Sequence, residues 1–314
     1  NLDKITYAST PEKFKIIDNK KNYRFYKIDL TNKIRINSFI KNYKPRIIIH
    51  LAAESHVDRS IDHPEIFIKS NILGTYYLFN AIKKNYKKKE LKKTKIIHVS
   101  TDEVYGNNVG TPSKEKSIYN PSSPYSASNA SADYIAKSFV LTFNLPIIIL
   151  NFCNTYGPYQ FTEKLIPTII FKLLSNQKVP IYGKGKNVRE WIFIEDCCRA
   201  IEISMKKGKS GDHFNIGSGF RCNNLYLTKM IYKLIKKEKL IKNFKNLISF
   251  VKDRPGHDLR YALNSSVFKR KTNWSSKTSM AVGLKKTLDW YLTNNKWFNH
   301  TRKIYRGHRQ GIND

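Results

Sequence analysis

The chain has 314 residues, with 57 Lys and Arg against 24 Asp and Glu, and its formal net charge at pH 7 is +33. This length suffices for one large α/β domain, or for a nucleotide-binding domain with a smaller one appended, around a substantial core. The sequence contains no run of about 18 apolar residues and no signal-peptide pattern, which argues against a membrane-spanning or exported protein. We therefore expect a cytoplasmic protein without a membrane partner.

The strong positive charge raises the question of nucleic-acid binding. Its distribution argues against that function, because the lysines form short clusters at expected helix ends and loops, without the interleaved aromatic residues that stack on bases. The clusters are residues 83–84, 87–89, 92–93, 206–207 and 236–237. We interpret them as solvated faces and expect no nucleic-acid partner.

The four cysteines are Cys153, Cys197, Cys198 and Cys222, and they form no CxxC pair and no ligand spacing with the histidines. Neither a zinc site nor a disulfide framework is therefore predicted. We expect four reduced thiols and no bound metal.

In chain order, the first elements are a strand end and a second strand. Residues 1–3 have the pattern of the end of a strand whose beginning is missing, so we expect the sequence to be an N-terminally truncated fragment. Residues 24–30 predict the second strand. The mixture of polar and apolar residues over 32–43 fits a short helix ahead of Pro45.

Three short apolar runs follow, at residues 46–53, 95–99 and 146–150. They are continuous and rich in β-branched residues, which is typical of strands buried on both faces of a parallel sheet. The segments between them, residues 64–89 and 124–144, are long and periodic enough for crossover helices. The repeated βαβ pattern predicts an α/β fold with a Rossmann-like, doubly wound parallel sheet.

Beyond residue 156 the pattern loosens into shorter elements punctuated by Pro and Gly. Helices are predicted over residues 195–206, 224–237 and 282–294. We interpret residues 1–156 as a nucleotide-binding domain. Residues 157–314 are interpreted mainly as a smaller C-terminal substrate domain, interleaved with the end of the sheet.

Polar residues follow each of the three buried strands. Residues 54–56 follow the first, residues 100–103 the second, and Asn151 and Asn154 the third. Each cluster alone is explained by a helix cap or a turn. Ligands of open α/β sheets bind beyond the carboxyl ends of the strands, so together the three clusters predict one crevice.

Two residues at these strand ends point to a dinucleotide. Asp3 ends the first strand, where a Rossmann-like fold places the carboxylate that binds the adenosine ribose, although the Gly-rich turn that should precede it is missing. Tyr125 lies on the first turn of a predicted helix, like the acid/base tyrosine of short-chain dehydrogenase/reductases. In those enzymes a lysine four residues later lowers the pKa of the phenol, whereas this chain has the uncharged Asn129.

Asp102 and Glu103 are adjacent carboxylates at the end of the second buried strand. Successive side chains of a strand point in different directions, so the two can address different atoms of a substrate. If the pocket separates their pKa values, one can protonate a leaving hydroxyl while the other removes a carbon-bound proton. A pair of solvated turn carboxylates is the alternative interpretation.

Four motifs carry a specific resemblance. They are residues 51–60 (LAAESHVDRS), 100–106 (STDEVYG), 163–167 (EKLIP) and 253–258 (DRPGHD). With them, essentially the whole chain resembles the dTDP-glucose 4,6-dehydratase family of extended short-chain dehydrogenase/reductases. The Thr-Asp-Glu triplet is the sharpest discriminator, because related sugar-nucleotide epimerases and decarboxylases generally lack it.

The resemblance implies a lyase that converts dTDP-glucose to dTDP-4-keto-6-deoxyglucose by transient hydride transfer to NAD. Tyr125 would take the O4 proton, Glu103 the C5 proton, Asp102 would protonate the departing O6, and Thr101 would hydrogen-bond O4. The NAD contacts it implies are Asp3, Lys4, Ile5, Thr6, Asp29, Leu30, Leu51, Ala52, Ala53, Ser70, Tyr125, Asn129 and Thr155. The nucleotide-sugar contacts it implies are Ser55, Thr101, Asn154, Lys164, Leu165, Pro180, Ile181, Tyr182, Arg189, Asn224, Arg254 and His257.

The resemblance also implies a homodimer and a place in deoxysugar supply for cell-surface polysaccharide, such as dTDP-rhamnose. Asn129 and the missing Gly-rich segment keep a second hypothesis open. In it the chain is a catalytically impaired or inactive relic that retains nucleotide-sugar binding or dimerisation.

Overall fold

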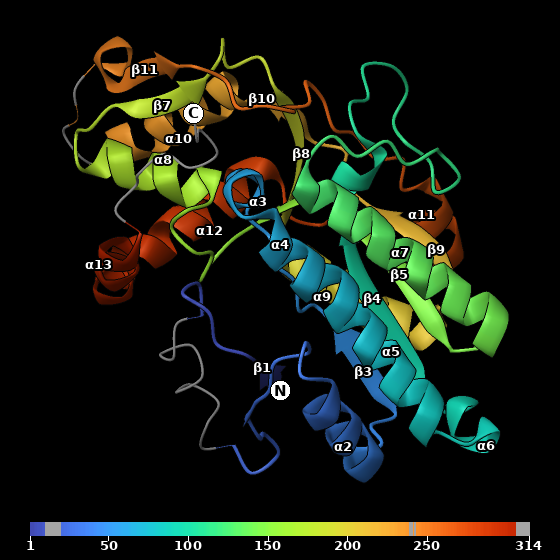
Figure 1. Cartoon of the computed structure of the whole chain (residues 1–314). Coiled ribbons are helices and arrows are strands. Elements are labelled where there is room, and N and C mark those ends of the chain that lie inside the picture. The colour runs from blue at the N-terminus through green and yellow to red at the C-terminus, as the bar shows by residue number, and fades with distance from the viewer. Residues whose placement is uncertain (10–19, 239–240, 242, 306–314) are drawn as a thin grey trace.

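The computed structural model describes residues 1–9, 20–238, 241 and 243–305 (Figure 1). Its centre is a four-stranded parallel sheet of order β3-β4-β5-β9, formed by β3 (Ile47–His50), β4 (Lys95–Thr101), β5 (Ile147–Phe152) and β9 (His213–Ile216). The three apolar runs supply β3, β4 and β5, and all six residues of β5 are buried. The predicted α/β class with a parallel sheet is confirmed.

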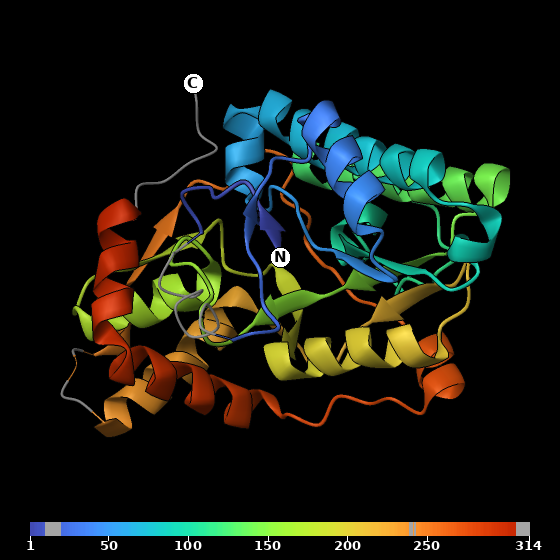
Figure 2. The ribbon, with the colours of Figure 1, turned by 90° about the horizontal axis from the view of Figure 1, so that it is seen from below.

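Helices cover both faces of this sheet (Figure 2). On one face lie α2 (Lys33–Tyr43), α5 (Gly74–Asn85) and α7 (Pro124–Phe143), and on the other lie α9 (Ile194–Lys207) and α11 (Ser266–Thr272). The apolar side chains between the layers form continuous cores, for example Ile36, Phe79 and Ile147 beneath α2 and α5. This arrangement opens the carboxyl ends of β3, β4 and β5 toward the second half of the chain.

The helix predicted over residues 64–89 is divided into four pieces. They are α4 (Pro64–Phe67), a π-helical turn η1 (Ile68–Leu73), α5 and α6 (Lys88–Leu91). The π turn inserts an extra residue and so turns Asn71 inward, where its side chain bonds the backbone N–H of Glu54 at 2.8 Å and the Glu54 carbonyl at 3.1 Å. Periodicity alone does not reveal such a local change of register.

The strand predicted over residues 24–30 is also shorter than expected. Only β2 (Tyr26–Lys27) pairs, in parallel with β1 (Leu2–Asp3), because the Asp29 carboxylate accepts the Thr31 N–H at 2.8 Å and turns the chain into α2. The sequence analysis also missed β9, although its four residues join the main sheet beside β5.

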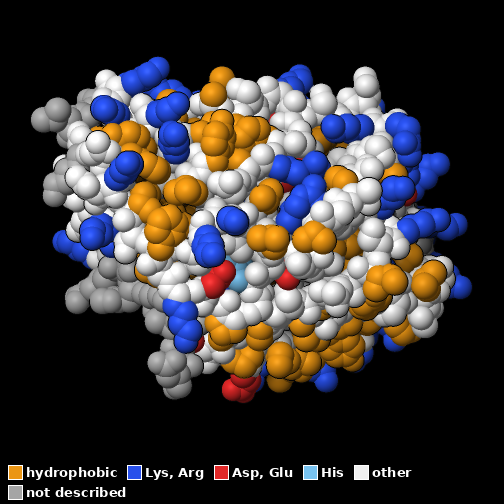
Figure 3. Space-filling view, turned by 90° about the horizontal axis from the view of Figure 1, so that it is seen from above, with side chains coloured by type: hydrophobic (Ala, Val, Ile, Leu, Met, Phe, Trp, Pro, Cys, Tyr) orange, Lys and Arg blue, Asp and Glu red, His pale blue; other side chains and the backbone are white. Residues whose placement is uncertain are grey.

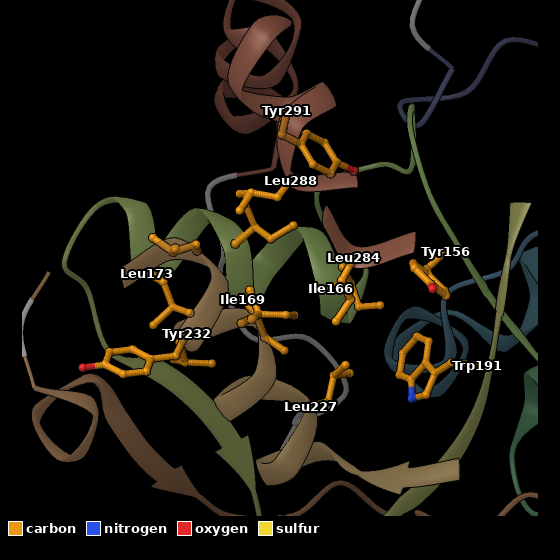
Figure 4. Close-up of a cluster of buried hydrophobic side chains, with 14 of the residues drawn as sticks. Tyr156, Ile166, Ile169, Leu173, Trp191, Leu227, Tyr232, Leu284, Leu288 and Tyr291 are labelled. Atoms are coloured by element: carbon orange, nitrogen blue, oxygen red, sulfur yellow. The ribbon is translucent and has the colours of Figure 1, made fainter. Parts of the chain in front are cut away.

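The remaining elements form a second lobe. It contains the sheet β10-β8-β6, from β10 (Arg221–Asn223), β8 (Val188–Phe193) and β6 (Asn154–Tyr156), and the pair β11 (Ile248–Val251) and β7 (Val179–Tyr182). Around these strands pack α8 (Leu165–Leu174), α10 (Asn224–Glu238), α12 (Met280–Thr293) and α13 (Asn295–Ile304), of which α8 and α13 were not predicted from the sequence. Figure 4 shows their common core, in which Ile166 and Leu284 face Trp191.

One edge of the main sheet is open. Ile47, Ile49 and Leu51, on and just after β3, are 53%, 40% and 59% exposed, and no described residue pairs with the outer edge of β3. Between this edge and the separate β1-β2 pair lies a cavity of about 750 Å³ lined by residues of both sheets. An exposed apolar strand edge is rare in a native protein unless another segment covers it.

Nowhere in the described part of the chain is a helix long and apolar enough to cross a membrane. All four cysteines are unpaired thiols, and three of them, Cys153, Cys197 and Cys222, are buried. Among the described residues, no group of three or more His, Cys, Asp or Glu is placed to hold a metal ion.

Candidate active site

A pocket of about 230 Å³ lies where the carboxyl end of β4 faces the second lobe. Its lining includes Glu103 and every predicted nucleotide-sugar contact except Thr101. Seven further lining residues were not assigned from the sequence: His56, Val57, Asp58, Glu163, Thr168, Trp191 and Tyr305. Residues as far apart in the sequence as Ser55 and Tyr305 therefore meet at the site that the strand ends predict.

The triplet Thr101 to Glu103 sits where β4 passes directly into a 3-10 turn, η2 (Asp102–Tyr105). The Thr101 hydroxyl caps this turn by accepting the Glu103 N–H at 3.3 Å, and it lies 3.3 Å from Asp102 Oδ1. All three side chains are buried. The two carboxyl groups therefore project from a buried 3-10 turn, and neither from a continued strand nor from a solvated turn.

The electrostatic surroundings of the two carboxyl groups differ. Burial raises the pKa of Asp102 well above its usual range, and the neighbouring Glu103 and Glu190 raise it further. Asp102 Oδ2 is buried and has no hydrogen-bond partner within the described parts of the chain, which suits a protonated acid rather than an anion. Burial also raises the pKa of Glu103, but the cationic groups of Arg254, Arg189 and Lys164 oppose that rise.

Tyr125 stands on the first turn of α7, beside this pair. Ser123 caps the helix through the Ser126 N–H at 3.1 Å, and Pro124 begins it. Burial raises the pKa of Tyr125, the Glu103 carboxylate raises it further, and a hydrogen bond with Thr101 lowers it. Asn129 Nδ2 donates to the Tyr125 backbone carbonyl at 2.9 Å, so the position that holds a lysine in related enzymes supplies no charge here.

Two arginines and a lysine give the pocket its positive potential. Arg254 Nη1 binds Asp58 Oδ1 at 2.5 Å, and its buried Nε has no partner among the described residues. Asp58 belongs to α3 (Val57–Asp62), and its carboxylate also accepts a hydrogen bond from the Tyr182 hydroxyl at 2.7 Å. The Arg254 cation holds the pKa of the buried Asp58 carboxyl below the usual value. Lys164 donates to the backbone carbonyl of Ser55. The pocket thus offers cationic donors suited to an anionic ligand.

A buried polar network supports the site from below. Asp133, which is fully buried in α7, accepts hydrogen bonds from His98, Ser100, Tyr119 and Asn151 at 2.8 to 3.1 Å. Burial alone would raise the pKa of Asp133, but the bonds from His98, Tyr119 and Asn151 hold it below the usual value. The network fixes α7, and with it Tyr125, against β4 and β5. Asn151 was expected in the crevice and lies in this network instead.

The residues predicted to bind a dinucleotide lie near β1, β3 and η1. Asp3 ends β1 and accepts the N–H of Ile5 at 2.7 Å, which holds the β-branched Ile5 at φ 57°, a rare conformation for such a residue. Lys4 pairs with Glu54 at 2.8 Å, and Leu51, Ala52 and Ala53 form an exposed segment after β3. These features fit the adenosine end of a dinucleotide, with a carboxylate at a parallel strand end and small residues that permit close backbone approach.

The rest of the predicted dinucleotide set is more dispersed. Thr6 accepts the Ala8 N–H at 3.3 Å, Asp29 caps the turn before α2, Ser70 lies in η1, and Thr155 Oγ1 lies 3.3 Å from Cys197 Sγ. Of the whole set, only Asp3, Leu30, Leu51 and Ala52 line the large cavity beside β3. The first glycine in the sequence is Gly74, so the residues present do not include a Gly-rich pyrophosphate cradle.

The comparisons with known proteins agree with this geometry. The family model described as GDP-mannose 4,6 dehydratase matches residues 1–287. A probable dTDP-glucose 4,6-dehydratase of Sinorhizobium fredii is 38% identical over 99% of this chain and 91% of its own length. The dTDP-glucose 4,6-dehydratase of Haemophilus influenzae is 41% identical over 94% of this chain and 90% of its own.

Solved structures show the same likeness. The dTDP-glucose 4,6-dehydratase DesIV of Streptomyces venezuelae, crystallised with NAD, is 35% identical, with a TM-score of 0.89 over 96% of this chain and 89% of its own. The Bacillus anthracis dTDP-glucose 4,6-dehydratase in complex with NAD is also 35% identical, with a TM-score of 0.84 over 96% of this chain and 90% of its own.

Proposed function

Since this chain belongs to the dTDP-glucose 4,6-dehydratase family of short-chain dehydrogenase/reductases, we propose that it converts dTDP-glucose to dTDP-4-keto-6-deoxyglucose with loss of water. It is accordingly an NAD-dependent hydro-lyase. The observation that carries the proposal is the buried pair Asp102 and Glu103 at the end of one strand, where Glu103 and Glu190 add to the rise in the pKa of Asp102, whereas Arg254, Arg189 and Lys164 oppose the rise in the pKa of Glu103. Two carboxyl groups in such different surroundings are what an acid and a base for one elimination require.

The roles of this chain's residues follow from those surroundings. Asp102, neutral in its buried site, delivers its proton to the departing O6 hydroxyl. Glu103, kept closer to its anionic form by Arg254, Arg189 and Lys164, removes the proton from C5. Tyr125 and Thr101 hydrogen-bond O4, and Tyr125 accepts the O4 proton. When bound, NAD supplies a reversible hydride acceptor, so that no net oxidation occurs.

The pocket's cations recognise the nucleotide. Arg254 and Arg189 offer planar guanidinium groups to the two phosphates of the substrate, with Lys164 as a further point charge. Arg189 is itself held by its donation to the Asp258 carbonyl at 3.0 Å. The substrate is therefore expected to bind more weakly as salt rises, and a nucleoside without phosphates should bind poorly.

We propose further that the open edge of β3 belongs to an incomplete NAD-binding domain. Parallel strands lie about 4.8 Å apart, so one additional strand between β1 and β3 would satisfy both edges and cover Ile47, Ile49 and Leu51. Such a strand, followed by a Gly-rich turn, would complete the NAD-binding domain to which we assign residues 1–156. Residues 157–314 would then hold mainly the nucleotide-sugar, with β9 returning to the main sheet.

A homodimer is the assembly that we propose. Apolar side chains are exposed along α4, η1, α5 and α7, and orange side chains gather along the corresponding lower edge of the molecule in Figure 3. The exposed residues are Ile66, Ile68, Leu73, Tyr76, Tyr134 and Leu141. A contiguous apolar face of this kind marks an interaction surface, and sedimentation velocity at micromolar protein should give a dimer mass.

The cytoplasm is the proposed compartment, because all four cysteines are unpaired thiols as expected in a reducing environment. The 4-keto-6-deoxy product is an activated sugar for epimerases and reductases of deoxysugar synthesis, of which dTDP-rhamnose synthesis is the proposed example. An inactive relic is the less supported alternative, since the triplet Thr101 to Glu103 and the cationic pocket are intact.

The direct test is to incubate the protein with NAD and dTDP-glucose and to follow the 4-keto product by its absorbance in alkali and by NMR. Product is expected, and it should disappear in Asp102→Asn, which keeps the volume of the side chain but cannot protonate O6. Formation of a 4-keto sugar that retains its 6-hydroxyl would show oxidation without dehydration. A complete lack of product, in the wild type and in a variant with a cation at position 129, would overturn the proposed function.

A further inference from the structure

Glu103 is a buried base, so the proton that it takes from C5 can exchange with solvent only if a path leads through the protein. Its side chain is 8% exposed and faces the pocket, so a sugar bound there would close its contact with solvent. Burial also raises the pKa of Glu103, which makes the protonated form more persistent. The side of Glu103 that faces away from the pocket is therefore the place to look for a proton path.

Three side chains form such a path. The Tyr261 hydroxyl lies 3.3 Å from Glu103 Oε2 and 2.7 Å from Asp258 Oδ2. Asp258 Oδ2 also accepts a hydrogen bond from the hydroxyl of Ser122, which is an exposed residue. Tyr261 is 3% exposed and Asp258 is 7% exposed, so the path runs through the protein and reaches water at Ser122.

We propose that Tyr261 and Asp258 form a proton relay that connects Glu103 with solvent while the sugar occupies the pocket. This inference rests on the proposed role of Glu103 as the base at C5. The relay is distinct from the predicted catalytic and binding residues, none of which is Tyr261 or Asp258.

The transfer balances in protons and changes no oxidation state. A phenol carries one proton and can accept another hydrogen bond on its oxygen, so it can donate to Asp258 while accepting from a protonated Glu103. In the transfer, the O–H bond of Glu103 breaks as a new O–H bond forms on Tyr261. The former phenolic proton moves to the Asp258 carboxylate, which then releases it to water beside Ser122. The reverse transfer brings a solvent proton through Asp258 and Tyr261 back to Glu103, which then delivers it to C5, and Tyr261 is a neutral phenol before and after each transfer.

The surroundings of Tyr261 suit this role. Burial raises the pKa of the phenol, and the Glu103 carboxylate raises it further, so the group does not ionise and passes its proton in a concerted exchange. The Arg189 guanidinium lies 4.1 Å from the centre of the Tyr261 ring, and the same group donates to the Asp258 carbonyl at 3.0 Å. The ring and the carboxylate are thereby held in line with Glu103.

The test is isotope exchange during turnover. The reaction is run with unlabelled substrate in D₂O, quenched within the first turnover, and the deuterium content at C5 of the product is measured by NMR. In the wild type the relay replaces the proton on Glu103 by deuterium before it returns to C5. In Tyr261→Phe that content should fall about tenfold or more, because a positioned acid/base group speeds proton transfer at least about 10²-fold.

Two further variants make the result specific. Asp258→Asn keeps a side chain of the same shape but cannot carry the proton, so it should match Tyr261→Phe. Tyr291→Phe is the matched control, because Tyr291 is also buried and its hydroxyl donates to the Gln160 carbonyl at 2.6 Å, away from Glu103. It should exchange like the wild type.

The outcomes separate the relay from the proposed function. If Tyr261→Phe forms product more slowly but with wild-type deuterium at C5, Tyr261 only positions Glu103 and the relay is wrong. If turnover of the wild-type chain is too slow to score, the same comparison is made in the Asn129→Lys background. If neither background forms any product, the proposed function fails first, and the relay falls with it for want of a base at C5.

Discussion

Replacing Asn129 by Lys should raise the dehydratase activity of this chain. Asn129 is 6% exposed and lies one helical turn from Tyr125, on the side of α7 that faces the active site. Its amide bonds the Tyr125 carbonyl at 2.9 Å and contributes no charge. With Glu103 and Asp102 raising the pKa of the phenol and no cation opposing them, Tyr125 stays protonated and is a poor proton acceptor for O4.

The size of the effect follows from the geometry of the helix. A cation about 4 Å from a phenolate, at an effective dielectric near 20, stabilises it by roughly 4 kcal/mol. Part of this stabilisation is lost because the ammonium group of the new lysine must be desolvated. A further part is lost because the Asp133 carboxylate, one turn farther along α7, competes with Tyr125 for the ammonium group. We expect a rise in kcat of about 10-fold to 10³-fold, which corresponds to roughly 1.4 to 4 kcal/mol.

The assay is the rate of 4-keto product formation at saturating dTDP-glucose and NAD, measured from pH 6 to 10. Asn129→Met is the matched control, because it has nearly the length of Lys without the charge. The Lys variant should reach its maximal rate at a lower pH than the wild type, since the cation lowers the pKa of Tyr125. Equal turnover of the wild-type and Lys enzymes, or an equal gain in Asn129→Met, would refute the electrostatic account of this position.

Three further predictions concern the carboxylates and the histidines. Glu103→Gln should lower kcat by about 10²-fold to 10⁴-fold without lowering the melting temperature, because a neutral amide suits a site that raises the pKa of its carboxyl. Asp58→Asn should raise KM by about tenfold or more with little change in kcat, because it releases Arg254 and Tyr182 from their shared carboxylate. Glu65→Gln on the exposed helix α4 is the control. An unchanged KM in Asp58→Asn would contradict the proposed role of this carboxylate. Thermal unfolding should show stability that is fully present only well above the unfolded histidine pKa of about 6.5. It should fall by roughly 1 kcal/mol per histidine between pH 7 and 5.5, since the folded protein holds four histidine pKa values below that of the unfolded chain. These histidines are His50 and His56, with pKa about 3, and His213 and His257, with pKa about 4.

The substrate side of the site was predictable from the sequence because its residues stand in short, recognisable motifs. Residues such as Lys164 and Arg254 were placed in one pocket by the motifs alone, and the structure brings them together. Asp58 stood inside one of those motifs, yet its partnership with Arg254 is a contact across 196 residues. No local pattern specifies that contact.

Tyr261 and Asp133 show a different limit. The function of each depends on burial and on partners from several elements. In the local sequence, Tyr261 is an ordinary polar residue near a turn, and Asp133 is an ordinary polar residue within a helix. The π turn at η1 was not predictable for the same reason. It places Asn71 to hydrogen-bond the Glu54 backbone, and it does not follow from the helix propensity of its own residues. The continuous apolar strands β4 and β5, in contrast, follow from composition because burial on both faces leaves few choices of side chain, whereas β3 has the same composition but is exposed at Ile47 and Ile49.

The network beneath α7 explains how the fold accommodates Asn129. A lysine lost from a buried site usually leaves a carboxylate unpaired, which destabilises the protein. Asp133, the fully buried carboxylate one turn from Asn129, is instead satisfied by four donors, none of which comes from position 129. Removing the cation therefore leaves no unpaired buried charge in this network, so stability does not require Lys at this position. The rate does depend on a cation here, because it would lower the pKa of the Tyr125 phenol. The effects of residue 129 on stability and on rate are therefore separable, and Asn129→Lys should change kcat far more than it changes the melting temperature.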